Sequence, residues 1–477
     1  MAMGLYLSPE QGSTGHLQRA PVEMFGAFGV LFGAAGLGND DDLIETLPLP
    51  AKDKTKLREL IFEAVDYLPG MSRKEQEHIL RSMSYTEYLS SHTGASETII
   101  ALLDDTLTQL FALNWHAVPA LQAVDLMMPG TQGLESGGGS VVRRAAQARR
   151  LLPLGVWQFL ADRLLAQAGV EPYIFHFPDG NASIARLLIR KMIPAVLQGN
   201  TMEDSVLARL DYDGLDSAEN NVRCRLNATV VDVRHQQDKA AVDVSYVKDG
   251  QHLRVVASHV ILACNNQVIP YICEELPQEQ VAALDLAERA PLCYINVALR
   301  NWRAFRDAGV DRIYAPGTEF PHMLLDFPVS MGGVEFSPDP DQPIVMHISY
   351  APAAGSPGES RSDRELFRQA QRVLYTKTFE DFEGAIKTQM NAMLGPFGFA
   401  ADRDIAAITV NRWTHGYAYT PYGSLGEPDV DDPGSPHYAA RRQNHRISIA
   451  NSDSEYHAYV DGAFDAAWRA VGEQIAL

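Results

Sequence analysis

The stretch RISIANSD, residues 446–453, predicts a short strand that ends at Ala450 and a turn that leads into a helix over residues 459–475. Backbone N–H groups at the start of a helix carry about half a positive charge. They suit an electron-rich carbonyl or a phosphate group placed at the end of the strand. An ordinary turn between a strand and a helix is the alternative interpretation of the same residues.

Upstream of this stretch, helical and strand-like patterns come in blocks. Apolar residues recur at helical spacing from 52 to 126, and Ser84 stands three residues before Glu87, which is the spacing of a capping box. From 222 to 263 the period changes to two, which predicts a β-meander. Its strands are expected at residues 224–233, 241–248, 253–257 and 259–263. Other strands are expected at 292–300, 343–350 and 405–412, and other helices at 156–168 and 363–394. Such blocks favour an α/β chain of mixed α+β type with two interleaved domains.

Composition and charge narrow the class of function. The 477 residues are 46% hydrophobic and carry a formal net charge of -20. A field of this sign repels nucleic acid and mildly favours cationic substrates. The N-terminus has no signal-peptide pattern, and the uncharged run 24–38 has about 15 residues, short of the ~20 that span a bilayer. We therefore expect no nucleic-acid partner, no transmembrane segment and a cytoplasmic protein, or a periplasmic one only if an exported partner carries it.

The four cysteines do not form a CxxC pair, and no metal site follows from them. Cys264 and Cys293 stand in apolar, strand-like runs. Buried free thiols are therefore favoured over two disulfides.

Three runs in a fixed order resemble the FAD-dependent amine oxidase superfamily. They are LNATVVDV at 226–233, HVILACN at 259–265, and RISIANSD at 446–453 followed by YVDGAFDAA at 459–467. Within the superfamily, residues 175–190, 290–305, 411–419 and 449–468 are most similar to the spermidine dehydrogenase-like branch. The resemblance covers nearly the whole chain. It implies an amine-oxidase-like fold and an enzyme that oxidises a C–N bond by hydride transfer to N5 of FAD.

The resemblance also implies which residues hold the flavin. Asp453 matches the acidic residue near the ribityl chain and phosphates, with Asn451 and Ser452 in place of the commoner Gly and Thr. Val230 matches the valine whose backbone contacts adenine, and Val231 takes that role if the register slips by one.

The same resemblance places an aromatic cage around the amine. The segment GYAYTPY, residues 416–422, carries one wall at Tyr419. Tyr459 is the expected second wall, beside the flavin, with Tyr456 as its alternative. Ala418 stands where monoamine oxidases have their flavin-linking cysteine, so noncovalent FAD is expected. Rings of this kind position an amine and attract its cationic form.

Four further residues bear on the amine site. His415 and Tyr417 belong to the cage segment, and His415 is a candidate to bind a proton or a distal amine. His176 is expected to pack against a sheet instead. Asp326 is a candidate to neutralise a cationic group, although a structural or solvated acid is the more common role.

The strand–GxGxxG–helix pattern that binds the FAD pyrophosphate is absent from the sequence. The glycines at 33–38 come in the wrong order, and those at 137–139 do not follow a strand. The resemblance implies that, compared with the family, the chain starts more than about a hundred residues late. We therefore expect a split enzyme in which a small Rossmann-containing subunit completes the FAD site. A truncated homologue is the rival explanation.

The expected domain plan follows from the blocks and the resemblance together. Residues 1–40 form an apolar, glycine-rich segment covered by the partner, 41–170 and 291–404 form the substrate-binding domain, and 171–290 and 405–477 form a partial FAD-binding domain. The function expected is that of the catalytic, substrate-binding subunit of a heteromeric amine oxidoreductase. The alternatives are a non-catalytic, regulatory remnant and a flavin oxidase of a biosynthetic intermediate.

Overall fold

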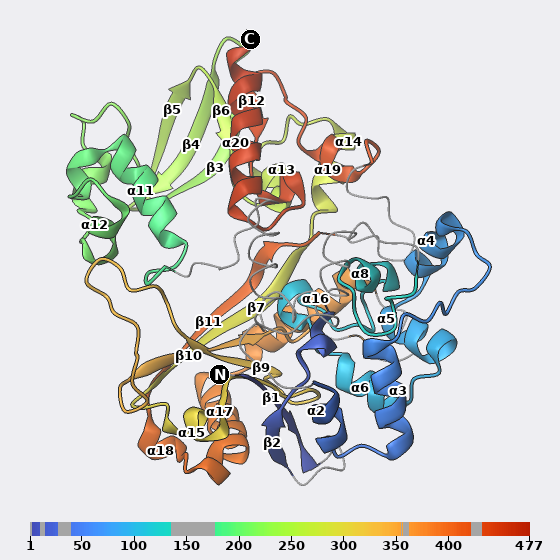
Figure 1. Cartoon of the computed structure of the whole chain (residues 1–477). Helices are drawn as coiled ribbons and strands as arrows, with labels where there is room; N and C mark the ends of the chain where they lie inside the picture. The colour runs from blue at the N-terminus through green and yellow to red at the C-terminus, as the bar shows by residue number, and fades with distance from the viewer. Residues whose placement is uncertain are drawn as a thin grey trace.

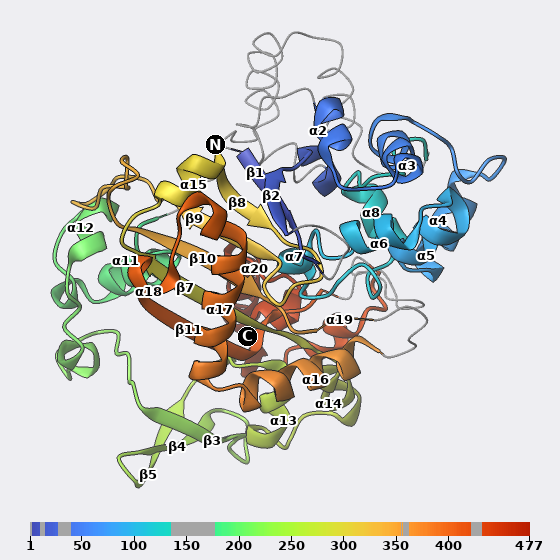
Figure 2. The same cartoon turned by 90° about the horizontal axis from the view of Figure 1, so that it is seen from below.

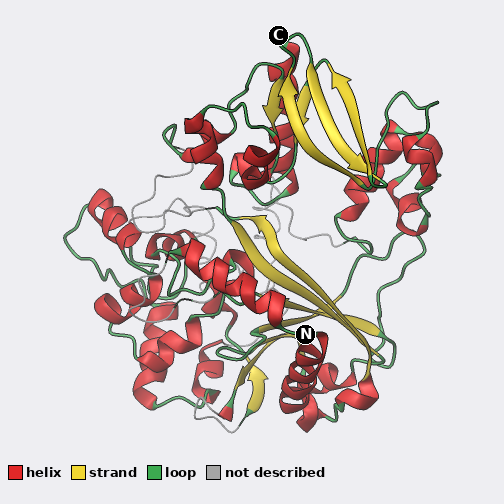
Figure 3. Cartoon of the chain, turned by 180° about the vertical axis from the view of Figure 1, so that it is seen from behind, coloured by secondary structure: helices red, strands yellow, loops and turns green. Residues whose placement is uncertain are grey.

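The structure is a computed structural model, and it describes residues 2–9, 15–26, 40–134, 177–353, 355, 362–420 and 432–477. Helices and several sheets are mixed in these residues, as the sequence predicts. A large sheet fills the lower half of the molecule in Figure 1, and the C-terminal helix stands in the upper half beside smaller sheets. The view from behind in Figure 3 shows the same division.

The large sheet contains strands from both ends of the chain. Its order is β11-β7-β10-β9-β8-β1-β2, and all neighbours are antiparallel except β1 and β8. The strands are β1 (Ala2–Leu7), β2 (His16–Arg19), β7 (Arg289–Leu299), β8 (Val310–Tyr314), β9 (His322–Asp326), β10 (Ile344–Tyr350) and β11 (Ile405–Ala418). Residues 2–7 and 16–19, from the segment expected to be covered by a partner, thus take their places in this sheet.

One face of the large sheet is buried beneath helix α17 (Phe379–Leu394), which crosses it in Figure 2. Alternate residues of β7, such as Ile295 and Val297, point into this core and meet Phe382 and Ile386 of the helix. The period of two along β7 therefore leaves the residues between them, such as Tyr294, on the opposite face.

The helix expected over residues 363–394 is divided in two, which corrects the prediction. Helix α16 (Asp363–Thr376) ends before Thr378, whose hydroxyl accepts a hydrogen bond from the Asp381 amide at 3.2 Å as the cap of α17. Threonine followed three residues later by an acid is a helix-start signal, and it prevails here over the continuous apolar pattern.

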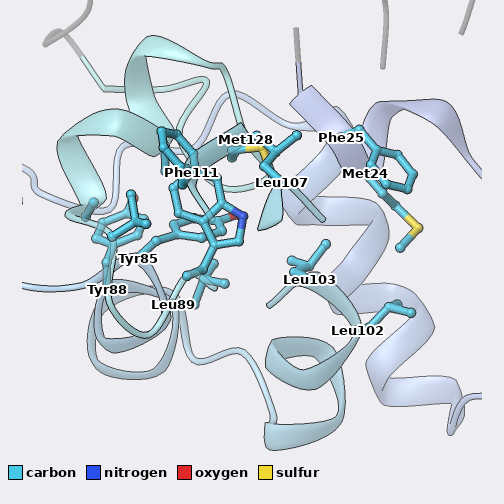
Figure 4. Close-up of a cluster of buried hydrophobic side chains, with 14 of the residues drawn as sticks. Met24, Phe25, Tyr85, Tyr88, Leu89, Leu102, Leu103, Leu107, Phe111 and Met128 are labelled. Carbon is cyan, nitrogen blue, oxygen red and sulfur yellow. The ribbon is translucent and has the colours of Figure 1, made fainter. Parts of the chain in front are cut away.

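Residues 52–126 form helices, as the sequence predicts, and Ser84 caps one of them through a capping box with Glu87; a further helix at residues 40–46 precedes the predicted range. Their core is shown in Figure 4, where Tyr85, Phe111 and Met128 are buried together. The helices are α2 (Asp40–Thr46), α3 (Ala51–Phe62), α4 (Arg73–Ser82), α5 (Tyr85–Tyr88), α6 (Glu97–Leu103), α7 (Thr108–Phe111) and α8 (Ala120–Asp125).

The smaller sheets lie near the C-terminus. Strands β3 (Ala228–His235), β4 (Val242–Lys248) and β5 (Gln251–Ala257) form the predicted antiparallel meander. Strand β6 (Val260–Leu262) was expected as its fourth strand, but it pairs in parallel with β12 (Ile447–Ile449) instead. Backbone hydrogen bonds hold β6 beside β12. The Val260 amide donates to the Arg446 carbonyl at 2.8 Å, and the Ala450 amide donates to the Leu262 carbonyl at 2.9 Å.

The remaining helices surround these sheets. They are α11 (Ala182–Met192), α12 (Met202–Leu207), α13 (Ile269–Ile272), α14 (Gln278–Asp285), α15 (Arg303–Ala308), α18 (Ala401–Asp404), α19 (Pro436–Ala440) and α20 (Val460–Ile475). In the described part of the chain, no helix combines the length and apolar character needed to cross a bilayer. The expected helix at 156–168, His176 and the glycines at 33–38 and 137–139 lie outside the described residues.

All four cysteines are free thiols, as the sequence predicts, although Cys224 and Cys264 are only partly buried. Cys273 and Cys293 are fully buried, and burial raises the pKa of each to about 12. Thiols of this kind stay protonated and behave as small apolar side chains.

A buried carboxyl group belongs to a hydrogen-bond network that joins the helical region to Gly355, beyond the end of β10. Asp104 accepts hydrogen bonds from the His116 amide at 3.1 Å and from the side chain of Asn114 at 2.8 Å. Asn114 in turn donates to the Gly355 carbonyl at 3.0 Å. Burial, with neighbouring Asp105, raises the pKa of Asp104 to about 8.

This pKa predicts a pH-dependent stability that Asp104→Asn removes. The unfolded carboxyl ionises near its ordinary pKa of 3.8, whereas the folded one keeps its proton until about pH 8. The contribution of Asp104 to the free energy of unfolding is therefore full below pH 4 and is lost as the pH rises to about 8. Relative to wild type, Asp104→Asn should gain stability across this window in urea unfolding at several pH values. Asp402→Asn, at an exposed carboxylate, is the control. If the free energy of unfolding of Asp104→Asn and wild type changed with pH in parallel, the raised pKa of Asp104 would be contradicted.

Candidate functional site

The candidate site begins at the carboxyl ends of the two parallel strands, β6 and β12. The Asn451 side chain donates hydrogen bonds to the Cys264 carbonyl at 2.5 Å and to Oδ1 of Asn266 at 2.9 Å, so it ties the end of β12 to the end of β6. Its own Oδ1 accepts from the Ser454 amide at 2.8 Å and caps the short 3-10 helix η8 (Ser452–Glu455). The carboxyl ends of parallel strands are where open α/β sheets bind their ligands.

A buried ion pair fixes the same turn to the large sheet. Asp453 is 1% exposed, and its Oδ1 lies 3.0 Å from Nη2 of Arg289 at the start of β7. Its Oδ2 accepts hydrogen bonds from the Asn266 amide at 2.9 Å and from Nε of Arg289 at 3.3 Å. Arg289 also donates to Oγ of Ser452 at 3.3 Å. The turn is thus held by charge as well as by backbone pairing.

Two polar atoms in this cluster are buried without a hydrogen-bond partner among the described residues. They are Nδ2 of Asn266 and Oδ1 of Asp453, whose contact with Arg289 lacks hydrogen-bond geometry. Buried polar groups in native proteins are nearly always satisfied, so each unpaired atom calls for a ligand or an ordered water. One donor and one acceptor in the same cluster suit a ligand that carries both carbonyl and hydroxyl groups.

Strand β11 reaches this cluster through an irregular stretch. Its pairing with β7 shifts between Trp413 and Tyr417, and the Gly416 carbonyl accepts a hydrogen bond from Nη1 of Arg289 at 2.8 Å. A Cβ at Gly416 would lie 2.2 Å from the Leu292 side chain and 2.5 Å from the Ala290 carbonyl. Only glycine allows this close approach, which brings the expected cage segment next to Arg289.

The face of the large sheet opposite α17 carries partly exposed aromatic side chains. Tyr294 is 43% exposed, and Trp413 on the neighbouring strand is 54% exposed. The Tyr294 ring meets the His347 ring edge to face at 5.1 Å. His347 is held by Oδ1 of Asn296 at 3.2 Å. This face therefore offers rings, an imidazole and an amide to a bound molecule.

Tyr459 stands between the turn and this aromatic face. It is the residue that precedes α20, it is 58% exposed, and its ring lies 5.2 Å from that of His457. Desolvation raises the pKa of the Tyr294 hydroxyl, and the nearby Tyr459 phenol adds to the rise. Figure 1 shows β7 and β11 running up to the foot of α20.

The other residues of the expected cage occupy different surroundings. Tyr419 is 5% exposed, its ring packs edge to face on Phe367 at 4.9 Å, and its hydroxyl donates to Asp363 at 2.6 Å. Tyr417 is partly buried and donates to the Leu110 carbonyl at 3.1 Å. His415 is exposed on β11, and Tyr456 packs on the His437 ring at 4.7 Å.

The remaining expected positions are accessible. Val230 and Val231 are exposed on β3, at the irregular step of the meander, where backbone groups can reach a ligand. Asp326 lies at the end of β9 opposite Val345 of β10, on the same face of the sheet as Tyr294.

Sequence reasoning did not find Arg289, Asn266, Tyr294 or Trp413. Arg289 directly precedes an apolar run. This position only weakly indicates that its side chain is buried and forms an ion pair. Tyr294 lies in a run where apolar and polar residues alternate, which predicts a strand with one buried face. The sequence does not indicate that the face carrying Tyr294 stays partly exposed. Both depend on contacts between segments far apart in the chain.

A family model for flavin containing amine oxidoreductases matches residues 205–473, more than half of the 477-residue chain. No curated protein sequence matches the chain.

Solved structures show the same fold at low sequence identity. Wild-type putrescine oxidase bound to putrescine is 17% identical, with a TM-score of 0.51, over 100% of this chain and 81% of that one. A triple mutant of putrescine oxidase, redesigned in its cofactor binding, is 16% identical, with a TM-score of 0.50, over 99% and 80%. Cyclohexylamine oxidase from Brevibacterium oxydans IH-35A is 13% identical with a TM-score of 0.46, over 99% and 80%. The putrescine oxidase comparisons confirm the expected fold.

Removal of Arg289 should destabilise the protein far more than removal of an exposed arginine. Arg289→Met leaves the Asp453 carboxylate buried without its countercharge, which costs about 3–5 kcal/mol. Arg306→Met, at an exposed pair with Asp307, should change the free energy of unfolding very little. Urea unfolding measures both. The double variant Arg289→Met/Asp453→Asn should recover part of the loss, and no recovery would contradict the ion-pair assignment.

Proposed function

The chain belongs to the family of flavin containing amine oxidoreductases, and we propose that it forms the amine-binding side of a heteromeric enzyme similar to spermidine dehydrogenases. It is an FAD-dependent amine oxidoreductase. The observation that carries the finer proposal is the buried turn with unpaired polar atoms at the carboxyl ends of β6 and β12, next to a partly exposed aromatic face. We assign the turn and the parallel strands to the flavin side and the large sheet to the amine side.

The residues of the turn fit a flavin. Nδ2 of Asn266 offers a donor and Oδ1 of Asp453 an acceptor, and both are buried without a hydrogen-bond partner in the described part of the chain, although Oδ1 also lies 3.0 Å from Nη2 of Arg289. Asn451 and Ser452 begin the turn, and the first amides of α20 add the positive end of a helix dipole. FAD, when bound, supplies the acceptor for a hydride from the carbon beside the amine nitrogen. We propose that the exposed Val230 and Val231 contact the adenine end.

We propose that Tyr459 and Tyr294 form the aromatic pair that positions the amine. Both rings are partly exposed, lie close enough for their phenols to interact, and stand beside the flavin turn. Rings of this kind attract a cationic amine and exclude water from its reacting carbon. Tyr419, which the sequence favoured, is buried and tethered to Asp363, so its proposed part is to position the end of β11.

His347 and Asp326 extend the proposed amine site along the sheet. His347 meets Tyr294 directly, and Asp326 lies further along the same face. A polyamine has a second nitrogen several bonds from the reacting one, and a carboxylate at a distance is suited to hold it. His415 remains a candidate to contact substrate from the exposed side of β11.

We propose that a separate chain supplies the Rossmann segment. The described residues contain no strand–GxGxxG–helix arrangement, and the parallel sheet at the turn has only two strands among them. A pyrophosphate is normally held where a glycine-rich turn opens a helix beside such a sheet. This division leaves the flavin ring and the amine to the present chain.

Truncation of the Tyr459 ring should weaken amine oxidation. Loss of a ring that contacts a cation costs about 1–2 kcal/mol, or roughly 5- to 30-fold in kcat/KM. The measurement is the bleaching of flavin absorbance by spermidine or putrescine in the flavin-loaded protein without oxygen. Tyr459→Phe keeps the ring and should stay near wild type, and Tyr212→Ala removes an exposed tyrosine elsewhere. Equal losses in Tyr459→Ala and Tyr459→Phe would contradict an aromatic contact, and no bleaching in wild type would contradict the enzymatic proposal.

The flavin should leave the protein on denaturation. Ala418, at the end of β11, offers no thiol for a covalent link, and burial at this position leaves little space for another attachment. Acid precipitation should therefore release all yellow colour into the supernatant. Flavin that stays with the precipitate would contradict noncovalent binding.

A further inference from the structure

The turn that follows β12 ends at Tyr456, and the backbone of this residue is left-handed. Its φ is 45° and its ψ is 36°. In this conformation the Cβ of an ordinary residue comes too close to the following carbonyl oxygen. A bulky residue keeps such a conformation only where its surroundings enforce it, and positions of this kind cluster at functional sites.

Backbone hydrogen bonds hold Tyr456 on both sides. Its amide donates to the Asp453 carbonyl at 3.3 Å, and the following amide, that of His457, donates to the Ser452 carbonyl at 3.2 Å. The carbonyl of Tyr456 accepts a hydrogen bond from the hydroxyl of Thr420. Thr420 lies two residues beyond the end of β11, so this bond ties the large sheet to the turn.

The ring of Tyr456 belongs to a buried aromatic stack. Tyr456 is 5% exposed, and its ring centroid lies 4.7 Å from that of His437 in α19, which is 4% exposed. The His437 ring also lies 4.1 Å from the Tyr438 ring. Burial, with nearby Arg441, lowers the pKa of His437 to about 4, so this imidazole is uncharged at neutral pH. An uncharged ring packs against Tyr456 without the cost of burying a charge.

Two arginines fix the helical turn η8, which precedes Tyr456. Arg441 donates to the Ser454 carbonyl at 3.1 Å and to the carboxylate of Glu455. Arg469 of α20 donates to the other oxygen of Glu455 at 3.4 Å and to the Ile449 carbonyl at 2.7 Å. Since η8 is held on one side, the backbone of Tyr456 decides the direction in which the chain leaves the turn.

The chain between Tyr456 and Tyr459 is short and packs closely on the start of α20. Nε2 of His457 lies 3.1 Å from Oδ1 of Asp461. A Cβ at Gly462 would lie 2.6 Å from Cδ2 of the same imidazole, so any other residue there would displace it. Tyr459 is the third residue after Tyr456, and their Cα atoms are at most about 11 Å apart. A change in the backbone of Tyr456 therefore moves Tyr459.

We propose that Tyr456 is a positioning residue for amine oxidation. Its ring, anchored on His437, keeps its backbone left-handed and thereby directs Tyr459 toward the amine. This role rests on the proposed function, in which Tyr459 and Tyr294 position the amine. Tyr456 is the alternative candidate for the aromatic wall itself, and its burial suits it instead to the support of that wall.

A double-mutant cycle separates positioning from a general structural role. Tyr456→Ala should lower kcat/KM for amine oxidation roughly 5- to 30-fold, as far as loss of the Tyr459 ring does. In the Tyr459→Ala background the same change should cost less than about 2-fold, because no ring remains to be positioned. Tyr456→Phe keeps the stack and should restore wild-type kcat/KM. Equal losses in the two backgrounds, or no rescue by Tyr456→Phe, overturn the proposal.

Fluorine NMR measures the placement of Tyr459 without flavin or amine. The full chain is labelled with 3-fluorotyrosine, and the signal that disappears in Tyr459→Phe is that of Tyr459. In Tyr456→Ala this signal should move toward the shift of free 3-fluorotyrosine. Tyr6→Ala is the matched control, because Tyr6 is 4% exposed and lies in β1, near the opposite edge of the large sheet from β11. It should leave the Tyr459 signal in place.

The two measurements keep the proposed function and the positioning role apart. A shifted Tyr459 signal in a protein that oxidises no amine sinks the proposed function alone, and an unshifted signal in an active enzyme sinks the positioning role alone. If urea unfolding shows that Tyr456→Ala does not fold, Thr420→Val takes its place. It removes only the hydrogen bond to the Tyr456 carbonyl, and it should shift the Tyr459 signal in the same direction; an unchanged signal overturns the proposal.

Discussion

The buried ion pair between Arg289 and Asp453 is the constraint on which the rest of the site depends. It connects the first residue of β7, in the large sheet, with the turn that follows β12, in the parallel sheet. Arg289 also holds the Gly416 carbonyl, so the end of β11 is fixed by the same guanidinium. A buried pair of this kind contributes little net stability, but it is costly to break on one side only. Its effect is therefore to specify where the two halves of the chain meet.

Several properties of the site follow from this junction. Asn266 and Asp453 lie at the carboxyl ends of the two parallel strands, where Nδ2 of Asn266 and Oδ1 of Asp453 are buried without a hydrogen-bond partner among the described residues. The strands that leave the junction carry Tyr294 and Trp413 on their partly exposed face. Oxidation of an amine by a flavin needs polar groups that hold the flavin and an apolar, aromatic surface that positions the amine. The junction brings these two surfaces together.

The sequence predicts the local helices and strands of this structure well. It predicts poorly which distant segments of the chain come together. The meander, the capping box at Ser84 and the C-terminal helix follow from periodicity and caps, which are local properties. The placement of β6 beside β12 and of β1 in the large sheet depends on pairing between distant segments, which periodicity does not specify. The same limit explains why Asp453 was found in its turn while its partner Arg289, 164 residues away, was not. Tyr419 matched the family segment, yet its environment beside Phe367 is decided by packing.

The most direct measurement of the central claim is hydrogen exchange of the flavin-loaded protein against the flavin-stripped protein. If the flavin binds at the carboxyl ends of β6 and β12, the amides of residues 264–267 and 451–456 should exchange more slowly when it is present. Those of α15, on the far side of the large sheet, should not change. Slower exchange elsewhere, with residues 264–267 and 451–456 unaffected, would contradict the account.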